Sequence, residues 1–110
     1  MRILGFSKKW SKLNGDTFTT FRFPRKDKDW QTGEHVQIVF KPRIKEREVL
    51  GEAYILSKDK RWVRDISTKE AIIDGFDLSF EAKVWFMDTY GERVDEEPMN
   101  KLTLKWIRRF

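Results

Sequence analysis

The stretch LNGDTFTTFRFPRKDKDWQTGEHVQIVF, residues 13–40, decides the fold of this chain. Asn14-Gly15 predicts a tight turn, because both residues tolerate a positive φ. The β-branched and aromatic residues after it predict a strand over Thr17–Phe23. A charged loop leads to a second turn at Thr32-Gly33, and apolar residues then alternate over Glu34–Lys41. The stretch therefore predicts two strands joined by a basic loop.

Thr20 and Arg22 are the first candidate site, since alternation along a strand puts both on one face. A guanidinium is a rigid donor fork that suits a phosphate or the edge of a base. A hydroxyl beside it and a loop dense in cations favour a seat for a phosphate or a nucleotide. The alternative is a structural Arg22 that pairs with Asp74 or another carboxylate inside the fold.

The flanking segments predict the remaining elements. We expect strands over 2–6, 49–56, 61–66 and 102–108, short helices over 7–13 and 67–74, a longer helix over 79–90, and an acidic mobile loop over 92–100. Gly51 inside a strand predicts a bulge. Phe80, Val84 and Met87 share helical spacing, Phe86 and Tyr90 widen the stripe, and we expect this stripe to face the core. The pattern predicts an α+β domain built on a small, closed, mostly antiparallel β-barrel with flanking short helices, although an OB-like barrel also fits.

Composition restricts the class of protein. A chain of 110 residues predicts a single domain over 1–110, and 37% charged residues without Cys suit a heat-adapted cytoplasmic protein. The lack of Cys excludes disulfides and thiolate metal sites, and a single histidine, His35, excludes a His cluster or a Ser-His-Asp triad. No apolar run is long enough for a membrane span. We expect a cytoplasmic monomer that uses no cofactor, metal or membrane.

Charge is distributed unevenly along the chain. The net charge is +5, and residues 1–47 hold 12 Lys and Arg against 5 Asp and Glu. A one-sided cationic field attracts polyanions such as RNA. The competing interpretation of the cations is a solvated, charge-rich surface. For Trp30 the alternative is that its side chain packs against the barrel and anchors the loop. The candidate nucleic-acid-binding residues are Thr20, Arg22, Arg25, Lys8, Lys9, Lys12, Lys26 and Trp30.

The order of residues also resembles a known family. An apolar residue, Gly15, then Thr20 and Arg22, and later Gly33 followed by an acidic residue, is similar to the ASCH family of the PUA-like superfamily. The resemblance implies a small β-barrel with flanking helices, in a superfamily mostly associated with RNA. It therefore implies RNA or a nucleotide as the partner.

One enzymatic branch of that family removes the acetyl group from N4-acetylcytidine with a Lys, a Thr and a Glu. By resemblance these positions fall on Thr17, Thr20 and Asp74, so only the Thr is kept. Thr17 has no amine, and Asp74 is one methylene shorter than Glu, which argues against this chemistry. Lys8, Lys9 or Lys12 could swing in from the preceding helix to supply the amine.

Three functions therefore stay open. We expect binding of RNA or a nucleotide first. The second is a hydrolase, either an amidohydrolase or a ribonuclease, with Thr20 and Asp74 as its catalytic residues. The third is a protein-interaction module that uses the acidic loop and Trp85.

Overall fold

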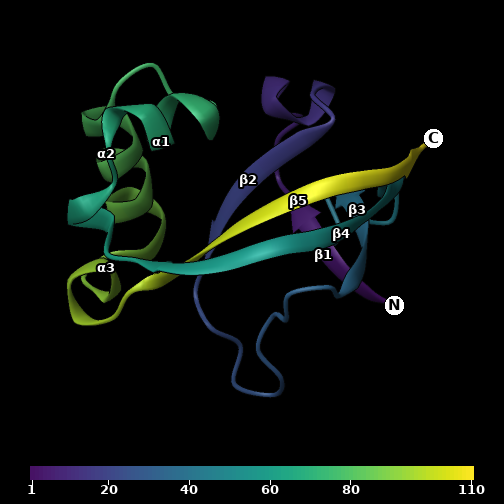
Figure 1. Cartoon of the computed structure of the whole chain (residues 1–110), viewed down its shortest axis with the longest axis horizontal. Helices are drawn as coiled ribbons and strands as arrows, with labels where there is room; N and C mark the ends of the chain where they lie inside the picture. Colours follow the sequence, from purple (N-terminus) through teal and green to yellow (C-terminus); the bar gives the residue numbers. More distant parts are fainter.

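A five-stranded mixed sheet is the frame of the computed structural model, which describes residues 1–110. The sheet has the order β1-β3-β4-β5-β2, with β1 parallel to β3 and every other pair antiparallel. The long strands β4 and β5 run side by side through the middle (Figure 1). The strands span β1 (Arg2–Phe6), β2 (Thr17–Arg22), β3 (His35–Phe40), β4 (Glu48–Arg61) and β5 (Met99–Arg109).

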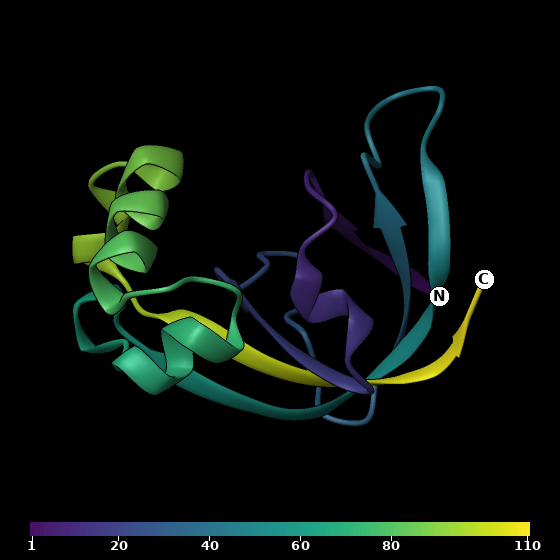
Figure 2. The same ribbon diagram turned by 90° about the horizontal axis from the view of Figure 1, so that it is seen from above.

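The sheet is open, so the closed barrel expected from the sequence is wrong. It curls into a trough whose edges are β1 and β2 (Figure 2). Side-chain contacts rather than a backbone ladder connect these two edges. Phe6 packs on Phe18 with ring centroids 6.2 Å apart, and Arg22 Nη2 donates a hydrogen bond to the Gly5 carbonyl at 2.7 Å.

The α-helices α1 (Thr68–Ile73), α2 (Ser79–Tyr90) and α3 (Arg93–Glu96) gather at one end of the sheet, together with the 3₁₀ helix η2 (Val63–Asp65) (Figures 1 and 2). The other 3₁₀ helix, η1 (Ser11–Asn14), lies beside β2. The predicted capping box is confirmed, because the Ser67 hydroxyl accepts from the Glu70 amide at 3.1 Å and Glu70 accepts from the Ser67 amide at 3.1 Å. None of the helices has the length and apolar character that a bilayer span requires.

The apolar core has two parts, and β2 contributes to both. Phe18 lies with Leu4, Ile38 and Leu104 in the cluster inside the trough. Phe21 points the other way, into a second cluster between the sheet and the helices. The two faces of β2 are therefore both buried, which leaves its polar residues enclosed as well.

Four local expectations differ from the structure. The helix expected over 7–13 begins only at Ser11. Its N-cap residue is Trp10, whose side chain makes no capping hydrogen bond. The strand expected over 61–66 is absent, because β4 continues to Arg61 and the chain then turns into η2. The acidic loop over 92–100 contains α3 and the first residues of β5.

The fourth difference concerns the inward face of α2. Phe80, Val84 and Met87 are 70%, 41% and 50% exposed, whereas Ala82 and Phe86 are buried. Apolar residues surround α2 on every side, so spacing alone did not identify the face that packs. Contact between Phe86 and Phe21, with centroids 5.6 Å apart, fixes the orientation.

Candidate functional site

A small pocket of about 130 Å³ lies at the seam between the two sheet edges. Strands β1 and β2, the segment η1, the C-terminal end of α1 and helix α2 all contribute to its wall. Its polar side chains are those of Lys12, Thr20, Arg22 and Asp74, besides two hydroxyls at the mouth, Ser7 and Thr89. The open sheet creates this pocket, since a closed barrel would join β1 to β2 here.

Lys12 and Asp74 form a buried ion pair in the pocket. Lys12 Nζ lies 2.9 Å from Asp74 Oδ1, and the side chains are only 6% and 4% exposed. The Thr19 hydroxyl donates to the same Oδ1 at 2.8 Å. Segment η1 brings Lys12 here because Leu13 anchors it in the core, and the end of α1 brings Asp74.

Burial changes the proton affinity of both partners. It lowers the pKa of Lys12 and raises the pKa of Asp74, because an enclosed site disfavours each charge. Their mutual attraction and the Thr19 hydrogen bond oppose these shifts without reversing them. An acid and a base with such perturbed pKa values, in contact within a pocket, are typical of functional sites.

Arg22 projects into the same pocket without a carboxylate partner. Its Nε donates to the Thr20 hydroxyl at 2.9 Å, and its Nη2 donates to Gly5. The guanidinium carbon lies 4.8 Å from the centre of the Phe6 ring, and burial lowers the pKa of Arg22. The ion pair between Arg22 and Asp74 that the sequence left open is not formed, since the only cation bonded to Asp74 is Lys12.

Two polar atoms of the pocket remain free to meet a ligand. Arg22 Nη1 and Asp74 Oδ2 have no hydrogen-bond partner in the protein. No buried side-chain polar atom is left unpaired, so each of these atoms keeps some accessible surface, although the Asp74 side chain is only 4% exposed. The pocket therefore offers the Arg22 guanidinium as a donor and the Asp74 carboxylate as an acceptor.

Aromatic rings form the apolar wall of the pocket. Trp10 lies 5.2 Å from Trp85, edge to face, and 5.3 Å from Phe76 between ring centroids. Phe86 and Tyr90 of α2 complete this wall. The sequence singled out Trp85 as an exposed aromatic residue that either packs against the acidic loop or contacts a partner. It gave no functional role to Trp10 or Phe76, whose contact depends on tertiary structure.

Two wider hollows adjoin the pocket, and they share no lining residue with each other. One, of about 700 Å³, shares Gly5, Ser7, Arg22 and Thr89 with it and adds Lys41 and Arg43. The other, of about 490 Å³, shares Trp10, Phe76 and Trp85 and adds Lys8, Phe80, Asp77, Glu81 and Asp88. One side of the pocket is therefore cationic and the other is aromatic and mainly acidic.

The remaining cations predicted for nucleic acid lie elsewhere. Lys8 caps the Trp10 ring at 4.4 Å, at the rim of the acidic hollow. Lys9 pairs with Glu48 at 2.7 Å. Arg25 and Lys26 line a separate polar hollow beyond the end of β2, of about 310 Å³. The structure thus joins Lys12, Thr20 and Arg22 in one pocket but leaves these four cations outside it.

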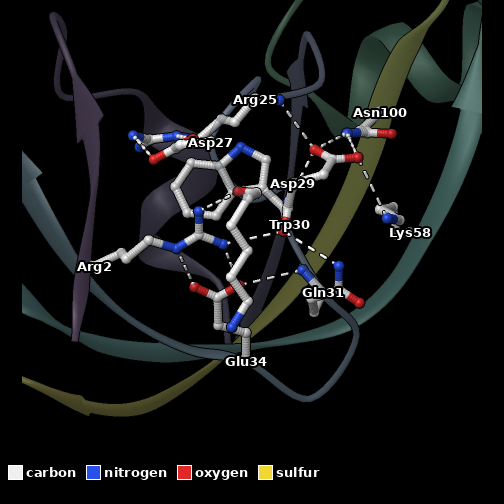
Figure 3. A network of polar contacts seen from close by, with 10 residues as sticks. Arg2, Arg25, Asp27, Asp29, Trp30, Gln31, Glu34, Lys58 and Asn100 are labelled. Atoms are coloured by element: carbon white, nitrogen blue, oxygen red, sulfur yellow. Dashed lines mark hydrogen bonds and ion pairs between the residues drawn. The ribbon is translucent and has the colours of Figure 1, made fainter.

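The basic loop after β2 is held by its own ion pairs (Figure 3). Asp29 accepts from Asn100 Nδ2 at 2.9 Å and pairs with Lys58, and Arg2 pairs with Glu34 at 2.6 Å. Arg25 pairs with Asp27, and its hydrogen bond is the main reason why the pKa of Asp27 falls to about 2.

Trp30 serves as the anchor of this loop. Its side chain is 4% exposed, and the guanidinium groups of Arg2 and Arg25 lie 4.4 and 5.5 Å from its ring centre (Figure 3). A buried indole between two cations offers no open face on which a base could stack.

Thr17, the position that the resemblance gave to an amidohydrolase lysine, is exposed and does not line the pocket. Lys12 instead brings an amine to Asp74 from the neighbouring segment. No three His, Asp or Glu side chains are grouped in a way that could hold a metal ion. A scan against protein-family models finds no match for this chain, and searches of curated proteins and of solved structures find none either.

Proposed function

We propose that this chain binds RNA or a nucleotide, with one base in the pocket beside Thr20 and Arg22. The observation that carries the proposal is that two atoms without a partner in the protein, Arg22 Nη1 and Asp74 Oδ2, belong to residues that line the same pocket as the aromatic wall. A base offers a donor and an acceptor on its edge and a flat face for stacking. An exocyclic amine of the base would donate a hydrogen bond to Asp74 Oδ2, and an acceptor atom of the base ring would accept a hydrogen bond from Arg22 Nη1.

The size of the pocket supports a single base as the part that enters. Pockets for whole small molecules measure roughly 300–1,000 Å³, and this one measures about 130 Å³. The sugar and the phosphate would remain in the adjoining hollow, beside Lys41 and Arg43. The resemblance to the ASCH family points to the same ligand class.

Calorimetric or NMR titration with nucleoside 5′-monophosphates tests the proposal. Arg22→Gln should abolish binding, whereas Arg25→Gln, an equal change of charge outside the pocket, should leave it unchanged. Ser7→Phe provides a second variant, because Ser7 is exposed at the mouth and a larger ring there blocks entry without disturbing the core. Equal effects of the two Arg variants, or full binding by Ser7→Phe, would refute this site.

An amidohydrolase is the second candidate, and the Lys12–Asp74 contact is the observation that favours it. In this candidate mechanism a neutral Lys12 amine takes a proton from the water that attacks the acetyl carbonyl, and Asp74, whose Oδ1 lies 2.9 Å from Lys12 Nζ, relays a proton to the cytidine amine as the C–N bond breaks and acetate leaves. Burial lowers the pKa of Lys12 and so favours the neutral amine that this step needs. Thr20 lines the same pocket. Incubation with N4-acetylcytidine should then release cytidine, and Lys12→Met should stop the release. Absence of product from the unaltered protein would retire this candidate while leaving nucleotide binding intact.

A further inference from the structure

The tip of the β3–β4 hairpin, residues 41–47, is the most cationic exposed segment beside the pocket. It carries Lys41, Arg43, Lys45 and Arg47 against a single acid, Glu46. All four cations are exposed, and none of them takes part in an ion pair. The tip projects away from the trough beyond the ends of the strands (Figure 2). Its charges are therefore available to an external anion.

The tip is fixed to the pocket rather than loosely attached to it. The Lys41 amide donates to the Phe6 carbonyl at 2.8 Å, and Lys41 is the one residue other than glycine with a positive φ, at 50°. Pro42 packs so closely on Gly5 that a Cβ at Gly5 would collide with its ring. Gly5 in turn accepts the Arg22 hydrogen bond. A strained backbone held in this way by its surroundings is a feature of binding sites.

The acidic hollow that adjoins the aromatic wall of the pocket repels phosphate. Asp77, Glu81 and Asp88 line the hollow that continues past Trp10 and Trp85, and Lys8 is the only cation there. A phosphodiester chain placed across this hollow would bring like charges together. The chain of a bound strand can therefore leave the pocket favourably only over the hairpin.

We propose that the ligand is a single-stranded polynucleotide whose backbone leaves the pocket over residues 41–47. This inference rests on the proposed function and extends it from one nucleotide to the neighbours of that nucleotide in a strand. Arg43 is placed to meet the phosphate next to the bound base, since it shares a hollow with Arg22. Lys45 and Arg47 lie further along the tip and would meet the following phosphates.

The test compares labelled hexanucleotides of RNA and of DNA with nucleoside 5′-monophosphates on the full chain. Lys45→Gln/Arg47→Gln removes two charges from the tip but none from the pocket. Lys69→Gln/Lys105→Gln is the control with the same change of charge, because both lysines are exposed and unpaired and line neither the pocket nor the hollows. Affinities are measured between about 50 and 200 mM salt, where phosphate contacts dominate the salt dependence.

We expect the hexanucleotides to bind roughly tenfold or more tightly than the mononucleotides, through their added phosphate contacts and stacking. The tip variant should lower the slope of log affinity against log salt by about 1.4, since each contacted phosphate of a single strand contributes about 0.7. Its affinity for mononucleotides should stay the same. Tighter binding of the RNA or of the DNA hexanucleotide identifies which polynucleotide is the preferred ligand.

The outcomes separate this inference from the proposed function. Hexanucleotides that bind no more tightly than mononucleotides, or a tip variant that behaves like the control, would overturn the inference alone. Absence of binding by both kinds of ligand would overturn the proposed function and this inference together.

Discussion

Lys12 and Asp74 lie 62 positions apart in the sequence, yet Lys12 Nζ is 2.9 Å from Asp74 Oδ1 in a place that solvent barely reaches. The pair connects the N-terminal segment η1 to the end of α1, so it links the two apolar clusters on either side of β2. Both side chains lose most of their hydration, and the ion pair returns only part of that cost. The buried pair is therefore a weak source of stability.

Replacing one member of this pair should destabilise the fold strongly, whereas replacing both members together should destabilise it much less. Lys12→Met or Asp74→Asn alone should lower the free energy of unfolding by about 3 kcal/mol, because each leaves a buried group without its partner. The double variant should recover most of that loss, since the amide oxygen that replaces the carboxylate would still accept from Thr19. Urea unfolding of the four proteins measures the coupling. Single-variant costs below about 1 kcal/mol would show that solvent hydrates the pair.

Glu70 should make the protein sensitive to acid. Burial alone would raise its pKa, but hydrogen bonds from Lys101, the Ser67 amide and Arg61 hold the pKa at about 2. Its pKa is thus lower in the folded than in the unfolded chain, where the ordinary value is 4.5. The stability from Glu70 is therefore complete above about pH 5 and is lost as the pH falls through 4.5 toward 2.

Glu70→Gln tests this pH dependence. Gln can keep the capping box but loses the charge that pairs with Lys101 and Arg61. At pH 7 the variant should be less stable by on the order of 2–3 kcal/mol, and the difference should vanish near pH 2. Glu96→Gln, at an exposed acid without an ion pair, is the control. A Glu70→Gln deficit that stays constant from neutral to acid pH would contradict the assignment.

Gly51 is required by the bulge that bends β4. The pairing register shifts between Ile38 and Val39 opposite it, so the bulge predicted from the sequence is confirmed. Its φ is +152°, and a Cβ would collide with the carbonyl oxygen of Arg108 on β5. Gly51→Ala should therefore cost about 2 kcal/mol or more, through backbone strain and a clash with a neighbouring strand.

Gly33 is the matched control for this effect. Its φ is +85°, but nothing lies within 4 Å of a Cβ added there. Gly33→Ala should cost only about 1 kcal/mol, which reflects the left-handed backbone alone. Chemical denaturation of both variants gives the comparison. A similar loss at the two positions would mean that β4 and β5 can separate to admit the methyl group.

Local chemistry made much of the fold predictable. The Thr-rich run predicted strand β2, and the capping residues Ser67 and Glu70 predicted the start of α1. Gly91, with φ +66°, predicted the end of α2. Each of these depends on residues close together in the sequence. The order of the strands depends on pairings between distant segments, so the sequence pattern could not distinguish an open sheet from a closed barrel.

The candidate site was predictable only in part, for the same reason. Thr20 and Arg22 could be placed together because they are two residues apart on one strand. The approach of Lys12 to Asp74 is a tertiary contact, and the sequence offered Lys12 only as one of several lysines. Trp30 shows the converse. The cations beside it in the sequence suggested a binding loop, but in the structure Arg25 and the distant Arg2 lie against its buried ring.

The exposed stripe on α2 gives the last prediction. Phe80 is 70% exposed and Phe86 is 4% exposed, although both are phenylalanines on the same helix. Phe80→Ala should change the free energy of unfolding by no more than about 0.5 kcal/mol, because it removes little buried surface. Phe86→Ala should cost about 3 kcal/mol or more, because it leaves a cavity beside Phe21. Thermal and urea unfolding measure both. Equal losses would mean that Phe80 is covered in solution, and a loss for Phe80→Ala that grows with protein concentration would identify a second copy of the chain as the cover.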